Sequence, residues 1–170
     1  MSTHVPALAV ALALSTFISV ESANTEPIEA FRGARILTAT GVIHDPGVLI
    51  VENGKIIAIG TVGNVKIPKE AAIRDLSGLV IIPGLVDSHS HLGVTSRPIV
   101  PSNRDGSEST GAIQSIVRAL DSLNPFDPGI RMANAGGLTT ANIMPGSSNV
   151  IGGQTIYVKL RGHSPEEMWI

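Results

Sequence analysis

An Asn-Gly pair between two β-branched runs is the feature that most narrows what this chain can fold into. Asn53-Gly54 follows Val-Leu-Ile-Val at 48–51 and precedes Ile-Ile-Ala-Ile at 56–59. A two-residue hairpin turn needs positive φ at both central positions, which Asn and Gly adopt most readily. A further short run, Arg-Ile-Leu-Thr, lies at 35–38 and an apolar run lies at 79–82, with Gly and Pro between them. The pattern predicts a small all-β module over residues 24–82.

After Pro83-Gly84 the pattern changes to strand, helices and strand. Residues 85–91 and 138–144 are the two predicted strands, and Asp127 with Pro128 predicts the cap and first turn of a short helix that ends at Gly136-Gly137. An earlier helix is predicted from apolar residues at helical spacing, namely Ile113, Ile116, Val117, Leu120 and Leu123. Two strands joined through helices form a βαβ crossover, the unit of parallel sheets and barrels.

The C-terminal residues predict the start of another helix. Ser164-Pro165-Glu166-Glu167 has the form of a capping box, with Ser as the N-cap and Glu three residues later. A closed (β/α)₈ barrel needs about 250 residues, more than the whole 170-residue chain. The expected fold class is therefore α/β, with a β module followed by the start of a TIM-type barrel over residues 83–170, truncated after its second strand.

Charge and cysteine content exclude several classes of function. The net charge is −2 and no basic block occurs, so nothing indicates binding to nucleic acid or to an anionic membrane surface. The absence of cysteine excludes disulfides and thiolate metal sites.

The N-terminal segment resembles a secretory signal peptide. Residues 5–20 are almost wholly apolar, and Ser22 and Ala23 are small residues suited to a cleavage site. The expectation is a signal peptide over residues 1–23, a secreted or periplasmic protein, and no membrane span after cleavage. No Lys or Arg precedes the apolar run, so an N-terminal core helix or an imprecise start site remains the alternative.

Two histidines at the end of the strand over 85–91 predict a metal site. Residues two apart on a strand point to the same face, so His89 and His91 can place their imidazoles on one ion at about 2.0–2.1 Å each. The C-terminal ends of barrel strands are where barrel enzymes build active sites. Asp87 shares that face and is the candidate for orienting a ligand. The alternative is two structural histidines on a strand.

The segment Gly-Leu-Val-Ile-Ile-Pro-Gly-Leu-Val-Asp-Ser-His-Ser-His at 78–91 resembles the entry strand of the amidohydrolase superfamily. The module around Asn53-Gly54 resembles the composite β-sandwich that flanks the barrel in that superfamily. The resemblance spans residues 31–170 and implies a hydrolase in which a divalent ion, commonly zinc, activates water. His89 and His91 match the first two metal ligands, whereas the further ligands and the catalytic base have no matching position. His163 lies on a predicted loop and is a poor candidate for a further ligand.

A Gly-rich loop at 144–154 is the second distinctive segment. It offers polar side chains at the barrel mouth, and Ser147, Asn149 and Gln154 are the candidate substrate-binding residues. It resembles a loop in imidazolonepropionase-like amidohydrolases, some of them carbohydrate esterases or deacetylases. A Gly-rich turn without a ligand is the alternative.

These expectations define a metal-dependent hydrolase acting on non-peptide carbon–nitrogen bonds of a small-molecule substrate, present as an incomplete chain. Amino-sugar deacetylation is the alternative within enzymes, and a non-catalytic truncated remnant is the alternative outside them. The open strand edges of an incomplete barrel favour association, so a homo-oligomer is also among the expected assemblies.

Overall fold

The computed structural model describes residues 26–170 and divides into two compact units. The first contains residues 26–35 and 44–79, and the second contains residues 36–43 and 80–170. The predicted signal peptide lies outside the described residues, and the domain boundaries at 23 and 82 stay predictions. No helix within 26–170 is both long and apolar enough to cross a bilayer.

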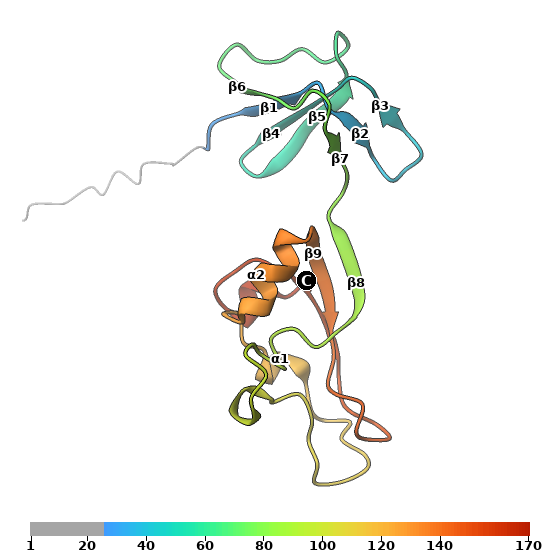
Figure 1. Ribbon diagram of the computed structural model, residues 1–170, viewed down its shortest axis with the longest axis vertical. Coiled ribbons are helices and arrows are strands. Elements are labelled where there is room, and N and C mark those ends of the chain that lie inside the picture. Colours follow the sequence, from blue (N-terminus) through green and yellow to red (C-terminus); the bar gives the residue numbers. More distant parts are fainter. Residues whose placement is uncertain (1–25) are drawn as a thin grey trace, which may run out of the picture. The chain divides into compact units, whose positions relative to one another are not determined.

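The first unit is built on a four-stranded sheet with the order β5-β4-β1-β6, shown in Figure 1. Strand β1 pairs antiparallel with β4 and parallel with β6. Ala30, Val48 and Ile50 form its buried core. The four strands are β1 (Glu29–Arg32), β4 (Gly47–Glu52), β5 (Lys55–Thr61) and β6 (Ala72–Asp75).

The hairpin predicted at Asn53-Gly54 is confirmed. It joins β4 to β5, which pair antiparallel, and φ is +50° at Asn53 and +70° at Gly54. Positive φ at both central residues matches the right-handed twist of the flanking strands. This turn sets the register of the two pairs nearest to it, Glu52 with Lys55 and Val51 with Ile56, and the register shifts by one residue beyond them.

A second, smaller sheet has the order β3-β2-β7. Its strands are short, and most of their residues belong to the second unit: β2 (Arg35–Leu37), β3 (Ile43–His44) and β7 (Val80–Ile81).

The main sheet of the second unit confirms the predicted βαβ crossover. Its order is β10-β9-β8, and β8 pairs parallel with β9, while β10 pairs antiparallel with β9. Helices α1 and α2 lie between β8 and β9 in the sequence, and Figure 1 shows α2 alongside β9. The elements are β8 (Leu85–Ser90), η1 (Pro101–Asn103), α1 (Ala119–Ser122), α2 (Pro128–Ala135), β9 (Leu138–Ile143), β10 (Ile156–Lys159) and α3 (Pro165–Met168).

The core of this unit lies between the sheet and the helices. Ala141 and Ile143 of β9 are fully buried and share a cluster with Ile130 of α2 and Val158 of β10. Residues 26–170 thus form a mixed α/β structure, mostly strands. A closed barrel is not among its features, and the truncated TIM-type barrel stays a prediction.

The helix predicted over residues 113–123 is wrong for most of its length. Only α1 is helical, and Ile113 and Ile116 are exposed. The preceding backbone pairs instead with the Gly-rich loop: Gln114 N donates to Ile151 O at 2.9 Å and Gln154 N to Val117 O at 2.7 Å. Because these backbone groups are bonded to a distant segment, they are not available to close helical turns.

Asp127 caps α2, as predicted, and also holds the loop that follows β8. Its carboxylate is buried and accepts three backbone hydrogen bonds, from Gly129 N (2.9 Å), Gly93 N (2.9 Å) and Arg97 N (2.8 Å). Ser164 likewise caps α3 by accepting from Glu167 N. A buried carboxylate is tolerated when its oxygens are satisfied in this way.

Replacing Asp127 by alanine is expected to destabilise the second unit by about 3 kcal/mol, because each buried donor left without an acceptor costs about 1–3 kcal/mol. Urea unfolding followed by fluorescence of Trp169, the single tryptophan, measures the change. Asp105→Ala, at an exposed position, is the matched control and should change stability by less than about 0.5 kcal/mol. Equal stability of the two variants would contradict a structural role for the Asp127 carboxylate.

Candidate metal centre

The two histidines lie where β8 ends. His89 is on the strand and exposed, and His91 is the first residue after it and half-buried. Ser90 between them is buried at 6% exposure. Because successive side chains on a strand point to opposite faces, Ser90 lies on the buried face and the two imidazoles lie on the other, as the spacing predicts.

The imidazole rings of His89 and His91 lie close enough to share an ion. Their centroids are 5.4 Å apart and the ring planes are perpendicular. Two imidazoles that bind one tetrahedral ion at about 2.0–2.1 Å have centroids roughly 5 Å apart. The pair fits two of the ligands of a zinc-type site.

The main chain of Met144 fixes the ring of His91. Met144 directly follows β9; its N–H donates to Ser90 O at 2.9 Å, and its carbonyl lies 2.8 Å from His91 Nδ1. With a proton on Nδ1, that nitrogen donates to the carbonyl and Nε2 keeps its lone pair. Histidines that ligate metals commonly donate their other ring N–H to a backbone carbonyl in this way. Sequence reasoning missed this contact, although two parallel strands ending at one edge were the signal for it.

Asp87 holds the backbone of the site. Its Oδ1 accepts a hydrogen bond from His89 N at 3.0 Å, and the side chain is half-buried. The carboxylate thus restrains the residue that carries one imidazole. A role for Asp87 in tuning a bound metal stays a prediction.

The predicted substrate-binding residues have different surroundings. Ser147 lines a hollow of about 640 Å³ together with His91. The amide nitrogen of Asn149 donates to the carbonyls of Glu108 and Gly111, both at 2.7 Å, and that of Gln154 donates to Ser115 O at 3.1 Å. Asn149 and Gln154 therefore join the Gly-rich loop to residues 108–118. Substrate contact by any of the three stays a prediction.

A third metal ligand is not found beside the pair within residues 26–170. No three His, Cys, Asp or Glu side chains of this part of the chain gather closely enough to hold an ion. His163 lines a separate hollow with Ile130 and Arg131 of α2. His89 and His91 instead open onto a hollow of about 450 Å³ that also contains Asp87 and Arg97.

No family model matches the chain. The chain is 37% identical over 114 residues to amidohydrolase tasK of Hapsidospora irregularis. The aligned region covers 66% of this chain and 12% of that protein. It is 37% identical over 79 residues to a dihydroorotase of Syntrophus aciditrophicus, a match that covers 46% of this chain and 18% of that protein. It is 40% identical over 53 residues to an imidazolonepropionase of Fusobacterium nucleatum, a match that covers 30% of this chain and 13% of that protein. The chain thus spans under a fifth of each of these relatives.

A solved structure supports the same relationship. The crystal structure of an amidohydrolase from Thermotoga maritima matches with a TM-score of 0.74 and 38% sequence identity. The match covers 83% of this chain and 36% of that protein.

The contact between His91 and Met144 predicts the tautomer of His91. Long-range ¹H–¹⁵N spectra of the metal-free protein should show the proton on Nδ1, since the facing carbonyl can only accept. His163, whose ring makes no hydrogen bond within the described residues, is the internal comparison, and its ring should not be confined to one tautomer. A proton found on Nε2 of His91 would contradict the proposed orientation of the ring.

Proposed function

The chain belongs to the amidohydrolase superfamily, and on that premise we propose that it carries the entry part of the metal centre of a hydrolase acting on non-peptide carbon–nitrogen bonds. The observation that supports this most directly is the His89–His91 pair, with ring centroids 5.4 Å apart and the Nδ1 atom of His91 against the Met144 carbonyl. The substrate is a small molecule.

The residues that would hold the ion are His89 and His91. When bound, a divalent ion, zinc in this proposal, makes a water molecule acidic enough to serve as a nucleophile near neutral pH. The Met144 carbonyl would hold a proton on Nδ1 of His91, which would leave the lone pair of Nε2 available to hold the ion. Asp87 holds the backbone of His89 through its N–H. Both restraints reduce the reorganisation that ion binding requires.

Two imidazoles fall short of the three protein ligands usual in a catalytic zinc site. The proposal therefore assigns the remaining ligands and the general base to residues outside 26–170.

Export of the protein is also part of the proposal. Its support is the apolar run at 5–20, which resembles the apolar region of a signal peptide.

Zinc binding tests the proposed ligands. Calorimetric titration of the 170-residue chain should show that His89→Ala and His91→Ala each weaken zinc binding by at least about 100-fold, more than the loss of an outer partner costs. Asp87→Asn should weaken it by about 10-fold, because its contact is to backbone rather than to the ion. His163→Ala is the matched control and Ser90→Ala the control within the segment, and both should bind as the unaltered chain does. Unchanged affinity in both histidine variants would show that the pair is structural.

The 170-residue chain by itself is expected to have little or no hydrolase activity, because no third His, Cys, Asp or Glu of the described residues joins the two imidazoles to complete the three protein ligands usual in a catalytic zinc site. The measurement is turnover of dihydroorotate and of hydantoin by the zinc-loaded chain, compared with the His89→Ala variant. Metal-dependent turnover that the variant lacks would contradict the assignment of the base and the remaining ligands to other residues.

A further inference from the structure

Strand β8 contains a β-bulge around His89. Asp87 pairs with Ala141 and Ser90 pairs with Ile143, so three steps along β8 match two steps along β9. One residue of β8 is therefore in excess. Bulges beside functional sites commonly re-aim a side chain, and the side chain concerned here is the imidazole of His89.

Two side chains bond the backbone of this bulge. Asp87 Oδ1 accepts a hydrogen bond from His89 N at 3.0 Å, and Asn142 Nδ2 donates to Ser88 O at 3.3 Å. Asp87 acts within β8, whereas Asn142 reaches across from β9. Because the residues of a bulge are left out of the regular ladder, their backbone groups need partners of this kind. Asn142 thus anchors the bulge to the neighbouring strand.

The oxygen of the same Asn142 amide is buried without a partner. Within residues 26–170, Oδ1 of Asn142 is the only fully buried side-chain nitrogen or oxygen atom that makes no hydrogen bond. A buried acceptor left unpaired costs about 1–3 kcal/mol, and native structures contain few of them. This atom is therefore a place where an additional hydrogen-bond donor would be stabilising.

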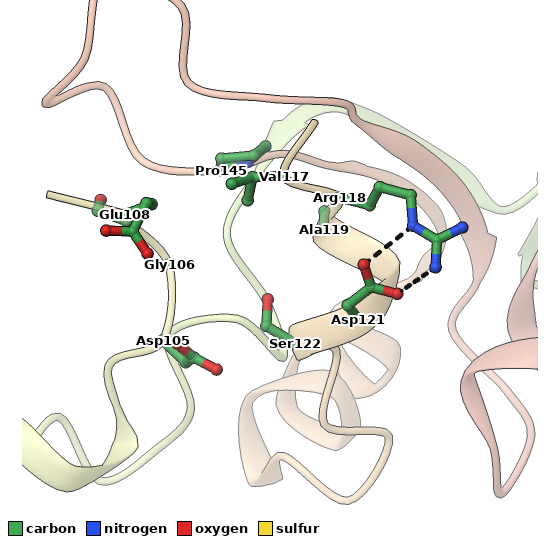
Figure 2. Close-up of a pocket in the computed structure, with 10 residues that line it drawn as sticks. Asp105, Gly106, Glu108, Val117, Arg118, Ala119, Asp121, Ser122 and Pro145 are labelled. Atoms are coloured by element: carbon green, nitrogen blue, oxygen red, sulfur yellow. Dashed lines mark hydrogen bonds and ion pairs between the residues drawn. The ribbon is translucent and has the colours of Figure 1, made fainter. Parts of the chain in front are cut away.

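Polar side chains elsewhere in the unit are paired even where they face solvent. Figure 2 shows the guanidinium of Arg118 joined to both oxygens of Asp121, and Glu108 accepts from Thr110 N at 2.8 Å. These hydrogen bonds lower the pKa of both carboxyl groups. The unpaired oxygen of Asn142 is thus exceptional.

The donor that Asn142 lacks is available on the same face of the sheet. Ala141 and Ile143, on either side of Asn142, are buried in the core, and so is Ser90 beside His89. Asn142 and the imidazole of His89 therefore both lie on the opposite face, on strands about 4.8 Å apart. The ring of His89 makes no hydrogen bond within the described residues, whereas the ring of His91 contacts the Met144 carbonyl.

We propose that Asn142 is the positioning residue of His89. Its Nδ2 holds the bulge through Ser88 O, and its Oδ1 accepts the ring N–H of His89 that the ion does not use. The exposed ring needs only rotation about its side-chain bonds to donate to Oδ1, and pairing a buried acceptor favours that orientation with or without an ion. The inference rests on the proposed function, because it assigns a second partner to a proposed ligand.

The two imidazoles would then be held in different ways. His91 is oriented by a backbone carbonyl, which no substitution at position 144 removes, whereas His89 depends on one side chain. Substitution of Asn142 should therefore affect His89 and leave the ring of His91 as it is.

The first measurement uses the zinc-free chain and long-range ¹H–¹⁵N spectra at about pH 8, where an imidazole is ordinarily neutral. The His89 ring should be confined to one tautomer in the unaltered chain. Asn142→Leu, which keeps the size of the side chain without its polar atoms, should populate both tautomers of His89 and leave His91 unchanged. Asn142→Asp keeps an acceptor oxygen and should keep the single tautomer.

Asn134→Leu is the matched control, since it removes an amide that also donates to a backbone carbonyl, that of Leu160, and lines a separate hollow. It should leave the His89 tautomer unchanged. Identical tautomer populations of His89 in the unaltered chain and Asn142→Leu would overturn the inference. Loss of the preference in Asn142→Asp as well would show that the acceptor oxygen is not responsible, with the same consequence.

The second measurement is calorimetric titration with zinc. Asn142→Leu should weaken zinc binding by about tenfold, the lower range for loss of an outer partner of a metal ligand, and Asn134→Leu should not weaken it. Equal zinc affinity of the two variants would contradict the positioning role. An unaltered chain that shows the single His89 tautomer but binds no zinc would refute the metal centre and leave the contact between Asn142 and His89 standing.

Discussion

The carboxylate of Asp127 is the interaction on which the arrangement of the second unit depends. It caps α2 and also holds Gly93 and Arg97, which lie 34 and 30 residues earlier in the sequence, in the loop that follows the histidine pair. Gly93 has φ of +79°, and a Cβ there would meet the side chain of Leu123. One buried anion thus satisfies donors from two segments and fixes the path of the chain away from the site.

The parallel pairing of β8 and β9 supplies the second constraint. It brings the main chain of Met144 to the end of β8, where its N–H and carbonyl contact Ser90 and His91. The restraint on the His91 ring therefore comes from backbone atoms and places no demand on the side chain at 144. Burial of Ser90, Ala141 and Ile143 on the core side keeps the two strand ends together.

The surroundings of His91 have an uneven charge distribution. His91 borders both the hollow that it shares with His89 and the hollow that contains Arg104, while the acidic residues Asp121 and Glu108 line a neighbouring hollow.

The sequence by itself determined the features that depend on neighbouring residues: the turn at Asn53-Gly54, the caps at Asp127 and Ser164, and the spacing that separates His89 and His91 from Ser90. The turn follows from the φ angles that Asn and Gly adopt, the caps from a backbone N–H two or three residues away, and the spacing from the alternation of side chains along a strand. Only the tertiary structure decided that residues 112–118 pair with the Gly-rich loop instead of forming a helix, and that Met144 orients His91. Both depend on hydrogen bonds between segments about 40 to 50 residues apart, and helical periodicity carries no information about such partners.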